Sequence, residues 1–311
     1  MPYKTLCITG GCGFIGRAVV RQALARGDCV YLVDSLTYAA DPTFPAWCAQ
    51  YATDRVTFVG RDVRALQRLP DVDAVIHLAA TTHVDNSLTE GEDFVAVNVG
   101  GTAHLLELVR GKAQHGMPHF VYVSTDEVYG DIADGQCTAS DPLRPSSPYA
   151  ASKAAADLLV QAWGRTYEMP YTILRPTNVF GIGQHPEKLI PKCVRSCVLG
   201  RPIPIHGDGS QTRQWLHVED CADAIILALD HGGPQNIYNI NGTAEVAVKD
   251  VAETIARLAG GRVEFGFRRP GMDMRYSVDD SAIRALGWCP KRDFWKELPG
   301  IVREEMGSFR F

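Results

Sequence analysis

The sequence predicts an α/β fold, a doubly wound parallel sheet that is followed by a smaller, interleaved substrate lobe. Short apolar runs alternate with segments of helical periodicity through the first half of the chain. A glycine-rich turn joins the first run to the first helical segment, and Asp34 ends the second run. Strand–helix–strand alternation at this spacing is typical of a parallel sheet with helices on both faces.

The elements follow from the periodicity, in chain order. Apolar runs predict strands at Thr5–Thr9, Cys29–Val33, Ala74–Leu78, Phe120–Ser124 and Tyr171–Leu174. Helical periodicity predicts helices at Ile15–Arg26, Phe94–Arg110, Tyr149–Thr166, Val218–Leu229 and Val248–Leu258. After Pro176 the connections become rich in glycine and proline. We therefore expect a nucleotide-binding domain over 1–174, with 211–232 returning to it, and a lobe built from 175–210 and 233–311.

Composition excludes several classes of protein. At 311 residues, with 46% hydrophobic and 22% charged residues, the chain matches an ordinary globular protein with a substantial core. A formal net charge of −5 gives no electrostatic reason to expect nucleic acid or an anionic membrane as partner. No apolar stretch approaches the roughly 20 residues of a membrane span. The first residues run straight into a strand pattern, so we expect no secretory leader.

The cysteines favour free thiols. Nine are present, at positions 7, 12, 29, 48, 137, 193, 197, 221 and 289, without C-x-x-C spacing. Cys193 and Cys197 share a helix face, but no histidine or cysteine cluster near them completes a metal site. We expect no metal, and a protein of a reducing compartment, the cytoplasm.

The glycine-rich turn predicts a dinucleotide site. Gly10, Gly13 and Gly16 stand between a strand and a helix, where the helix N-terminus offers free N–H groups to a pyrophosphate, as in Rossmann domains. Asp34 lies 18 residues beyond Gly16, near the spacing of a carboxylate that binds the adenosine ribose. Such a carboxylate repels a 2′-phosphate, so NAD is favoured over NADP. The alternative for Asp34 is a solvated turn residue.

A tyrosine and a lysine form the first catalytic candidate. Ser147 and Pro148 predict a helix start, which places Tyr149 and Lys153 on one face at i, i+4. Tyrosine is a poor base near neutral pH, but a neighbouring ammonium and a positive nicotinamide favour the phenolate. The alternative is an exposed Tyr–Lys pair, which is common on helices.

Together with the segment Val123–Gly130, these motifs resemble the extended short-chain dehydrogenase/reductase family over nearly the whole chain. Nucleotide-sugar 4,6-dehydratases of that family carry a Thr-Asp-Glu triplet, here Thr125, Asp126 and Glu127. Related epimerases and UDP-glucuronate decarboxylases differ there, the latter with Ser in place of Asp. The resemblance implies an NAD-dependent hydro-lyase of deoxysugar biosynthesis, as in rhamnose pathways, that makes a 4-keto-6-deoxy sugar from an NDP-glucose.

The resemblance also implies residue roles. Tyr149, tuned by Lys153, takes the 4-hydroxyl proton while the C4 hydride passes to NAD⁺, and Thr125 hydrogen-bonds near O4. Glu127 removes the C5 proton, Asp126 protonates the departing 6-hydroxyl, and the hydride returns to C6. Elimination of this kind uses two carboxyl groups in different protonation states. Without the resemblance, Asp126 and Glu127 are an acidic pair at a strand end, although ligands bind at that end of parallel strands.

Further contacts are implied by the same resemblance. Those to the cofactor are Phe14, Ile15, Thr37, Asp62, Val63, Leu78, Ala79 and Ala80, beside the glycines, Asp34, Tyr149 and Lys153. Those to the substrate are Thr82, His83, Asn178, Glu187, Lys188, Leu189, Pro204, His206, Arg213, Asn239 and Arg269. Arginines suit a diphosphate because the guanidinium fork binds two oxygens at once.

Two positions depart from the bacterial dTDP-glucose dehydratases, which usually have Tyr at the place of His206 and His at the place of Met272. Methionine cannot donate a hydrogen bond to a phosphate. The runs Pro204–Ser210 and Thr82–Ser87 look closer to the UDP-glucose 4,6-dehydratase part of plant rhamnose synthases. These features favour UDP-glucose over dTDP-glucose.

Two other functions stay open. A UDP-glucuronate decarboxylase or 4-epimerase is one, and Asp126 argues against it. A non-catalytic NAD-binding sensor is the other, since fold does not determine function, but such a protein is expected to lose Tyr149, Lys153 or the carboxyl pair. We also expect a homodimer: apolar positions such as Ala151, Ala155, Leu158 and Leu159 lie beyond the active-site face, and in relatives the equivalent helices pair across a two-fold axis.

Overall fold

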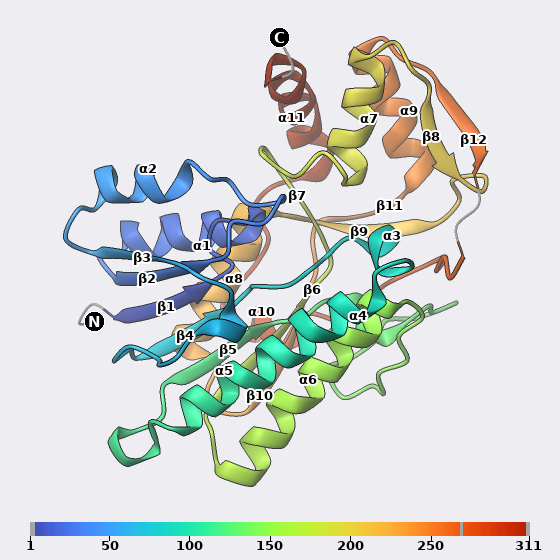
Figure 1. Ribbon diagram of the computed structural model, residues 1–311. Coiled ribbons are helices and arrows are strands. Elements are labelled where there is room, and N and C mark those ends of the chain that lie inside the picture. The colour runs from blue at the N-terminus through green and yellow to red at the C-terminus, as the bar shows by residue number, and fades with distance from the viewer. Residues whose placement is uncertain (1–3, 268–269, 309–311) are drawn as a thin grey trace.

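A seven-stranded parallel sheet forms the centre of the protein, whose computed structural model describes residues 4–267 and 270–308 (Figure 1). The strand order is β10-β6-β5-β4-β1-β2-β3. The strands are β1 (Thr5–Thr9), β2 (Cys29–Asp34), β3 (Val56–Gly60), β4 (Ala74–His77), β5 (His119–Val123), β6 (Tyr171–Pro176) and β10 (Asn236–Ile240). The predicted α/β fold with a doubly wound parallel sheet is confirmed.

Helices cover both faces of this sheet. On one face lie α1 (Phe14–Ala25), α2 (Phe44–Tyr51) and α8 (Val218–His231), and on the other α5 (Gly101–Arg110) and α6 (Pro148–Tyr167). Alternate residues of one strand enter opposite cores. In β5, Val121 packs with the α1 and α8 side, whereas Phe120 and Tyr122 pack against the α5 and α6 side. Burial on both faces explains why these strands read as continuous apolar runs.

The five predicted strands and most of the predicted helices are confirmed to within a few residues. The helix expected at Phe94–Arg110 is instead three pieces: α4 (Gly91–Phe94), a π-helical turn η2 (Val95–Gly100), and α5. The sequence pattern predicted neither β3 and α2, at one edge of the central sheet, nor β10 at the other. Strand β3 is largely exposed, so it lacks a continuous apolar pattern.

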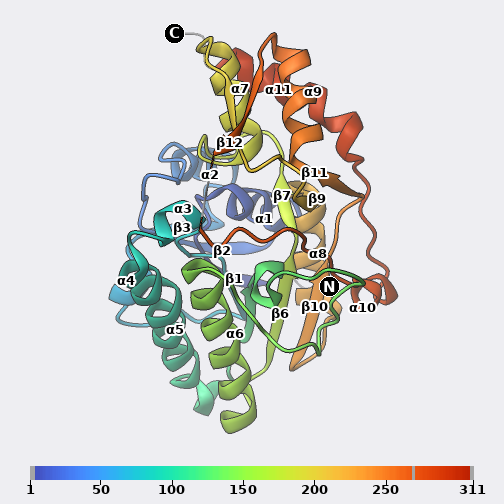
Figure 2. The same ribbon diagram turned by 90° about the vertical axis from the view of Figure 1, so that its right-hand side faces the viewer.

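The lobe has its own core, built from α7 (Leu189–Val198), α9 (Val248–Ala259) and α11 (Phe294–Ser308). Its strands form a three-stranded sheet and a two-stranded sheet. The three-stranded sheet holds β7 (Asn178–Phe180), β9 (Thr212–His217) and β11 (Ala244–Ala247), and the two-stranded one β8 (Ile203–His206) and β12 (Val263–Phe267). In Figures 1 and 2, α7, α9 and α11 stand together at the top of the molecule.

The expected domain bounds need a correction on both sides. Strand β10 comes from the segment assigned to the lobe, yet it pairs in parallel with β6 and extends the central sheet. Strand β9 comes from 211–232, yet it pairs with β7 and β11 in the lobe. Within that returning segment it is α8, together with Leu216 at the end of β9, that packs on the nucleotide-binding side, with α8 against α1. The chain therefore crosses between the two units more often than composition indicates.

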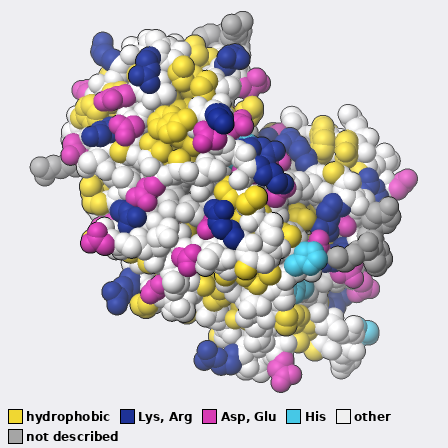
Figure 3. Space-filling view, turned by 180° about the vertical axis from the view of Figure 1, so that it is seen from behind, with side chains coloured by type: hydrophobic (Ala, Val, Ile, Leu, Met, Phe, Trp, Pro, Cys, Tyr) yellow, Lys and Arg dark blue, Asp and Glu magenta, His cyan; other side chains and the backbone are white. Residues whose placement is uncertain are grey.

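Short elements complete the fold. They are η1 (Val63–Ala65), α3 (Val84–Ser87), η3 (Ala113–His115), η4 (Asp126–Tyr129) and α10 (Ser281–Ala285). Within the described ranges, no helix is long and apolar enough to cross a membrane. Basic and acidic side chains are interspersed over the face in Figure 3, in keeping with the modest net charge. All nine cysteines are free thiols.

Candidate active site

A large cavity lies at the carboxyl ends of β1, β2, β4, β5 and β6, and all the residues predicted to bind the cofactor line it. They come from the glycine turn, the end of β2, the segment after β3, the end of β4, and α6. Carboxyl ends of parallel strands are where such folds bind ligands. The structure thus gathers residues that are far apart in the chain around one space.

The glycine turn is packed too closely to hold side chains. Gly10 has φ +70°, and a Cβ built there would meet the backbone nitrogen of Ala79 at 2.5 Å. A Cβ at Gly16 would meet the carbonyl oxygen of Gly10 at 2.1 Å. Gly13 is the N-cap of α1, and no side chain caps that helix. Free N–H groups at this helix start fit a pyrophosphate, so the residues present fit a dinucleotide.

Asp34 is 7% exposed, so its interpretation as a solvated turn residue is wrong. Its Oδ2 accepts a hydrogen bond from Cys12 N at 2.9 Å, and its Oδ1 accepts one from Leu36 N at 2.8 Å. Two backbone donors orient the carboxylate at the cavity wall, and its remaining lone pairs suit ribose hydroxyls.

The two candidate carboxyls stand on η4, directly after β5. Thr125 caps this short helix, and its Oγ1 accepts a hydrogen bond from Glu127 N at 3.3 Å. Asp126 is buried, and its Oδ2 has no hydrogen-bond partner among the described residues. Burial raises the pKa of Asp126 to about 8, with a further rise from Glu127 and an opposing effect of Arg213. Asp126 therefore carries its proton at neutral pH, as a general acid needs.

Tyr149 and Lys153 are buried on the first turns of α6, so they are no exposed surface pair. Ser147 caps this helix as predicted, since its Oγ accepts a hydrogen bond from Ala150 N at 3.1 Å, and Pro148 is the first helical residue. The position of the ring is therefore set by the helix start and by burial.

The electrostatics of this pair differ from expectation. Lys153 Nζ donates to the carbonyl oxygen of Val123 at 2.7 Å and lies over the Tyr122 ring, 4.4 Å from its centroid. Burial lowers the pKa of Lys153 to about 7. Burial and the charge of Glu127 raise the pKa of Tyr149, and a hydrogen bond with Thr125 lowers it. A positively charged nicotinamide near the Tyr149 ring would favour the phenolate.

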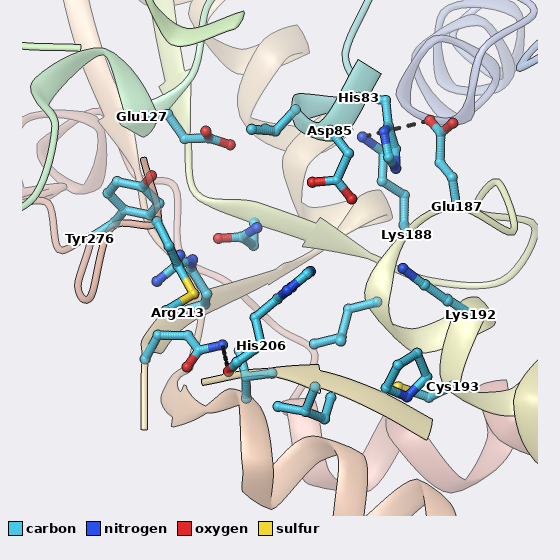
Figure 4. Close-up of a pocket in the computed structure, with 18 of the residues that line it drawn as sticks. His83, Asp85, Glu127, Glu187, Lys188, Lys192, Cys193, His206, Arg213 and Tyr276 are labelled. Atoms are coloured by element: carbon cyan, nitrogen blue, oxygen red, sulfur yellow. Dashed lines mark hydrogen bonds and ion pairs between the residues drawn. The ribbon is translucent and has the colours of Figure 1, made fainter. Parts of the chain in front are cut away.

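A second cavity adjoins the first and shares Thr82, Glu127, Asn178, Glu187 and Lys188 with it. Figure 4 shows its wall, with Glu127 and Tyr276 on one side and Lys188 and Lys192 on the other. Nine of the residues predicted to bind substrate line this space: Thr82, His83, Asn178, Glu187, Lys188, Leu189, Pro204, His206 and Arg213. Met272 also lies on the wall, so its inability to donate a hydrogen bond concerns the cavity itself.

Two predicted substrate residues are not brought to this cavity by the structure. The Asn239 side chain is buried away from it: Oδ1 accepts from Tyr129 Oη at 2.6 Å, and Nδ2 donates to the carbonyl oxygens of Cys137 and Asp279. The polar atoms of this side chain bond to other parts of the protein, and Asn239 lines neither cavity. Arg269 lies outside the described residues.

Several residues that line this cavity were not predicted from the sequence, among them Lys192 and Tyr276. Lys192 stands four residues after Lys188 on α7, and that i, i+4 spacing could have found it. Tyr276 has no such local signal, because only the path of the chain after Pro270 brings it to the cavity that Glu127 also lines. Within 4–267 and 270–308, no group of three or more His, Cys, Asp or Glu side chains could hold a metal ion.

Comparisons with known proteins agree with this site. The model of the NAD dependent epimerase/dehydratase family matches residues 6–241. The dTDP-glucose 4,6-dehydratase of Neisseria gonorrhoeae is 41% identical, over 96% of this chain and 95% of its own length. The trifunctional UDP-glucose 4,6-dehydratase/UDP-4-keto-6-deoxy-D-glucose 3,5-epimerase/UDP-4-keto-L-rhamnose-reductase of Arabidopsis thaliana is 38% identical over 94% of this chain and 46% of its own length. The crystal structure of a dTDP-glucose 4,6-dehydratase from Streptomyces venezuelae with NAD and TYD bound superposes with a TM-score of 0.91, at 40% identity and 98% coverage of both chains.

Proposed function

The chain belongs to the NAD-dependent epimerase/dehydratase family, with NAD as its cofactor, and we propose that it is a nucleotide-sugar 4,6-dehydratase. It is a hydro-lyase that converts an NDP-glucose into the NDP-4-keto-6-deoxyglucose. One observation carries the proposal: a buried Asp126, whose pKa is raised to about 8, stands beside Glu127 in the cavity that also holds Tyr149. An elimination of water needs such a protonated acid beside a base.

The first half of the reaction uses Tyr149 and its neighbours. Tyr149 takes the proton of the 4-hydroxyl, and Thr125 supplies a hydrogen bond beside it. Lys153, whose Nζ donates to the carbonyl oxygen of Val123, lines the same cavity, and its proposed role is to contact the nicotinamide ribose. Bound NAD supplies the redox chemistry, since a hydride leaves C4 for the nicotinamide and later returns to C6. The 4-keto group then makes the neighbouring C5–H bond acidic.

The two carboxyls carry out the second half. Glu127 takes the C5 proton, and the electron pair of that bond forms the C5–C6 double bond. The C6–O6 bond breaks as Asp126 gives its proton to O6, so water leaves. A proton returns from Glu127 to C5 when the hydride arrives at C6. The proton that Tyr149 took from the 4-hydroxyl must be released, and Asp126 must regain the proton that it gave to O6, so the protons balance over one cycle. The hydride that left C4 returns to C6, so the reaction is redox-neutral overall.

Other reactions of the fold make less use of these groups. A 4-epimerase or a UDP-glucuronate decarboxylase expels no hydroxyl from C6, so it has no task for a protonated Asp126. A non-catalytic sensor needs neither Asp126 nor the buried Tyr149. The retention of both favours the dehydratase.

For the nucleoside we propose UDP-glucose or dTDP-glucose, and His206 and Met272 on the cavity wall favour UDP-glucose. The test is to incubate the protein separately with UDP-glucose, dTDP-glucose, CDP-glucose and GDP-mannose. Product is read as the absorbance that 4-keto-6-deoxy sugars develop in alkali. We expect product without added reductant and without net NADH. Stoichiometric NADH formation, or no product from any of the four, would contradict the proposed function.

A further inference from the structure

The segment 270–276 lies between η4, which carries Asp126 and Glu127, and the lobe. Asp131, just after η4, accepts hydrogen bonds from the backbone nitrogens of Met274 and Arg275 through Oδ1, at 2.9 and 2.8 Å. On the other side, Thr212 N donates to the carbonyl oxygen of Met274 at 2.8 Å. The segment is therefore held at both sides, and its side chains have defined places.

Tyr276 is oriented by a buried carboxylate. The hydroxyl groups of Tyr276 and Ser146 both donate to Asp273 Oδ2. The Arg213 guanidinium lies over the Tyr276 ring, 4.4 Å from its centroid, and donates to the carbonyl oxygen of Asp273 at 2.9 Å. Tyr276 and Asp273 are both buried. Because the phenol proton of Tyr276 is donated to Asp273, the phenol oxygen can only accept a hydrogen bond from a group in the cavity.

Tyr276 and the candidate base Glu127 line the same cavity. In Figure 4 the Tyr276 hydroxyl lies on the side of its ring that faces Glu127. Burial and the charge of Glu127 raise the pKa of Tyr276, so the phenol stays neutral while it faces that carboxyl. A neutral acceptor beside a carboxyl group stabilises the protonated form of that carboxyl, because only that form can donate a hydrogen bond.

We propose that Tyr276 is a positioning residue that accepts a hydrogen bond from Glu127 once that carboxyl has taken the C5 proton. The inference rests on the proposed dehydratase reaction and deepens it. The proton leaves C5 for a Glu127 oxygen while the electron pair of the C–H bond forms the C5–C6 double bond. Tyr276 then holds the protonated carboxyl in place until the same proton returns to C5. No redox partner beyond bound NAD is involved.

The test compares Tyr276→Phe with Ser146→Ala. Tyr276→Phe keeps the ring over Arg213 but removes the acceptor, so kcat should fall about tenfold, the factor that one lost buried hydrogen bond costs, with KM little changed. The acid limb of the kcat profile, where protonation inactivates the base, should also move to lower pH. Ser146→Ala removes the other donor to Asp273 and should leave the kcat profile where it is in the wild type.

Two further variants test the orientation of the phenol. Asp273→Ala removes the group that orients Tyr276 and should reproduce the Tyr276→Phe profile. Asp273→Asn keeps an oxygen that can accept the phenol proton and should return the profile toward that of the wild type. Thermal unfolding and bound NAD content, measured for each variant, separate these effects from loss of the fold.

The possible outcomes are distinct. If the wild type forms no 4-keto-6-deoxy sugar, the proposed function fails. If the wild type is active but Tyr276→Phe keeps its kcat and acid limb, the role of Tyr276 is overturned. Equal changes in Tyr276→Phe and Ser146→Ala would also overturn it. They would show that the hydrogen bonds of Ser146 and Tyr276 to Asp273 only support the start of α6.

Discussion

At the scale of residues, burial is the main determinant of the chemistry in this site. It raises the pKa of Asp126 to about 8, lowers that of Lys153 to about 7, and raises that of Tyr149. Each shift favours the neutral form, because a buried group loses the hydration that stabilises its charge. Proton transfers between such groups and a substrate avoid the cost of creating isolated charges.

Tyr149→Phe should lower kcat by about 10²–10⁴-fold, the usual contribution of general acid–base catalysis, and leave bound NAD unchanged. The ring is kept, so the loss would come from the missing hydroxyl. Tyr167→Phe is a matched control, since Tyr167 stands at the far end of the same helix and its ring contact with Arg110 needs no hydroxyl. A Tyr149→Phe enzyme within about threefold of the wild type would argue against the assignment of Tyr149 as base.

The raised pKa of Asp126 predicts how elimination depends on pH. An acid must carry its proton, so elimination should be intact below pH 8 and should decline as the pH rises through about 8. The measurement is the pH profile of kcat. With a substrate that carries fluoride at C6, which leaves without protonation, the alkaline decline due to Asp126 should disappear, and Asp126→Asn should be least impaired.

Glu127→Gln is the complementary variant. It should still oxidise C4, because Tyr149 remains, but elimination should stop for lack of a base. A single turnover would then leave NADH and the 4-keto-hexose on the enzyme, which the NADH absorbance reports. Normal turnover, or no oxidation of C4, would show that the division of labour between Asp126 and Glu127 is incorrect.

At the scale of elements, the site is built where regular structure begins or ends. The glycine turn follows β1, η4 follows β5, and Tyr149 stands on the first turn of α6. The π-helical turn η2 also holds parts of the site together. Asn98 Oδ1 accepts a hydrogen bond from Thr81 N at 2.8 Å, and Asn98 Nδ2 donates one to Ser152 Oγ at 2.8 Å. Such turns are frequent at functional sites, and this one links the end of β4 to the catalytic helix.

Gly16→Ala should abolish NAD binding and destabilise the protein. The added Cβ would lie 2.1 Å from the Gly10 carbonyl oxygen and 2.7 Å from Gly11 Cα, both backbone atoms that cannot move without opening the turn. Gly300→Ala is the control, because the site in α11 has open space around the added methyl group. It should keep the thermal midpoint or raise it, since alanine favours helix over glycine by about 1 kcal/mol. Retention of NAD by Gly16→Ala would contradict the close packing of the turn.

At the scale of the whole molecule, lobe and sheet domain meet across the two cavities. Tyr38 Oη donates to Glu187 at 3.0 Å, and Lys188 Nζ donates to the carbonyl oxygen of Thr82 at 2.9 Å. These contacts join the loop after β2 and the segment after β4 to the segment that precedes α7. A dinucleotide in the first cavity would thus lie under the lobe, which suits a cofactor that stays bound through turnover.

The outer face of α5 and α6 predicts a homodimer. Leu158 on α6 is 54% exposed, and Val95 on η2, the turn that leads into α5, is 56% exposed. Light scattering at micromolar concentration should therefore report twice the mass of one chain. Leu158→Glu should shift that mass toward one chain, whereas Leu199→Glu, at another exposed leucine that lies on the lobe, should not. A wild-type monomer would refute the prediction.

Much of the fold and of the site was predictable, because local patterns determine them. Buried strands read as apolar runs, and the turn after β1 must be glycine. Asp34 ends β2, and Asp126 and Glu127 come shortly after β5. Tyr149 and Lys153 follow from a helix start marked by Ser147 and Pro148. In each case the signal lies within about twenty residues, and the topology of parallel strands then brings the carboxyl ends together.

What the sequence by itself determined is the fold class with five of the seven central strands, the class of the cofactor site and the candidates for the reacting groups. Only the tertiary structure decided that β10 extends the central sheet, that Asn239 faces Tyr129 rather than the cavity, and that Lys153 binds Val123. It also brought Tyr276 to Glu127 and raised the pKa of Asp126 to about 8. These outcomes depend on burial and on contacts between residues far apart in the chain, which no local pattern of residues encodes.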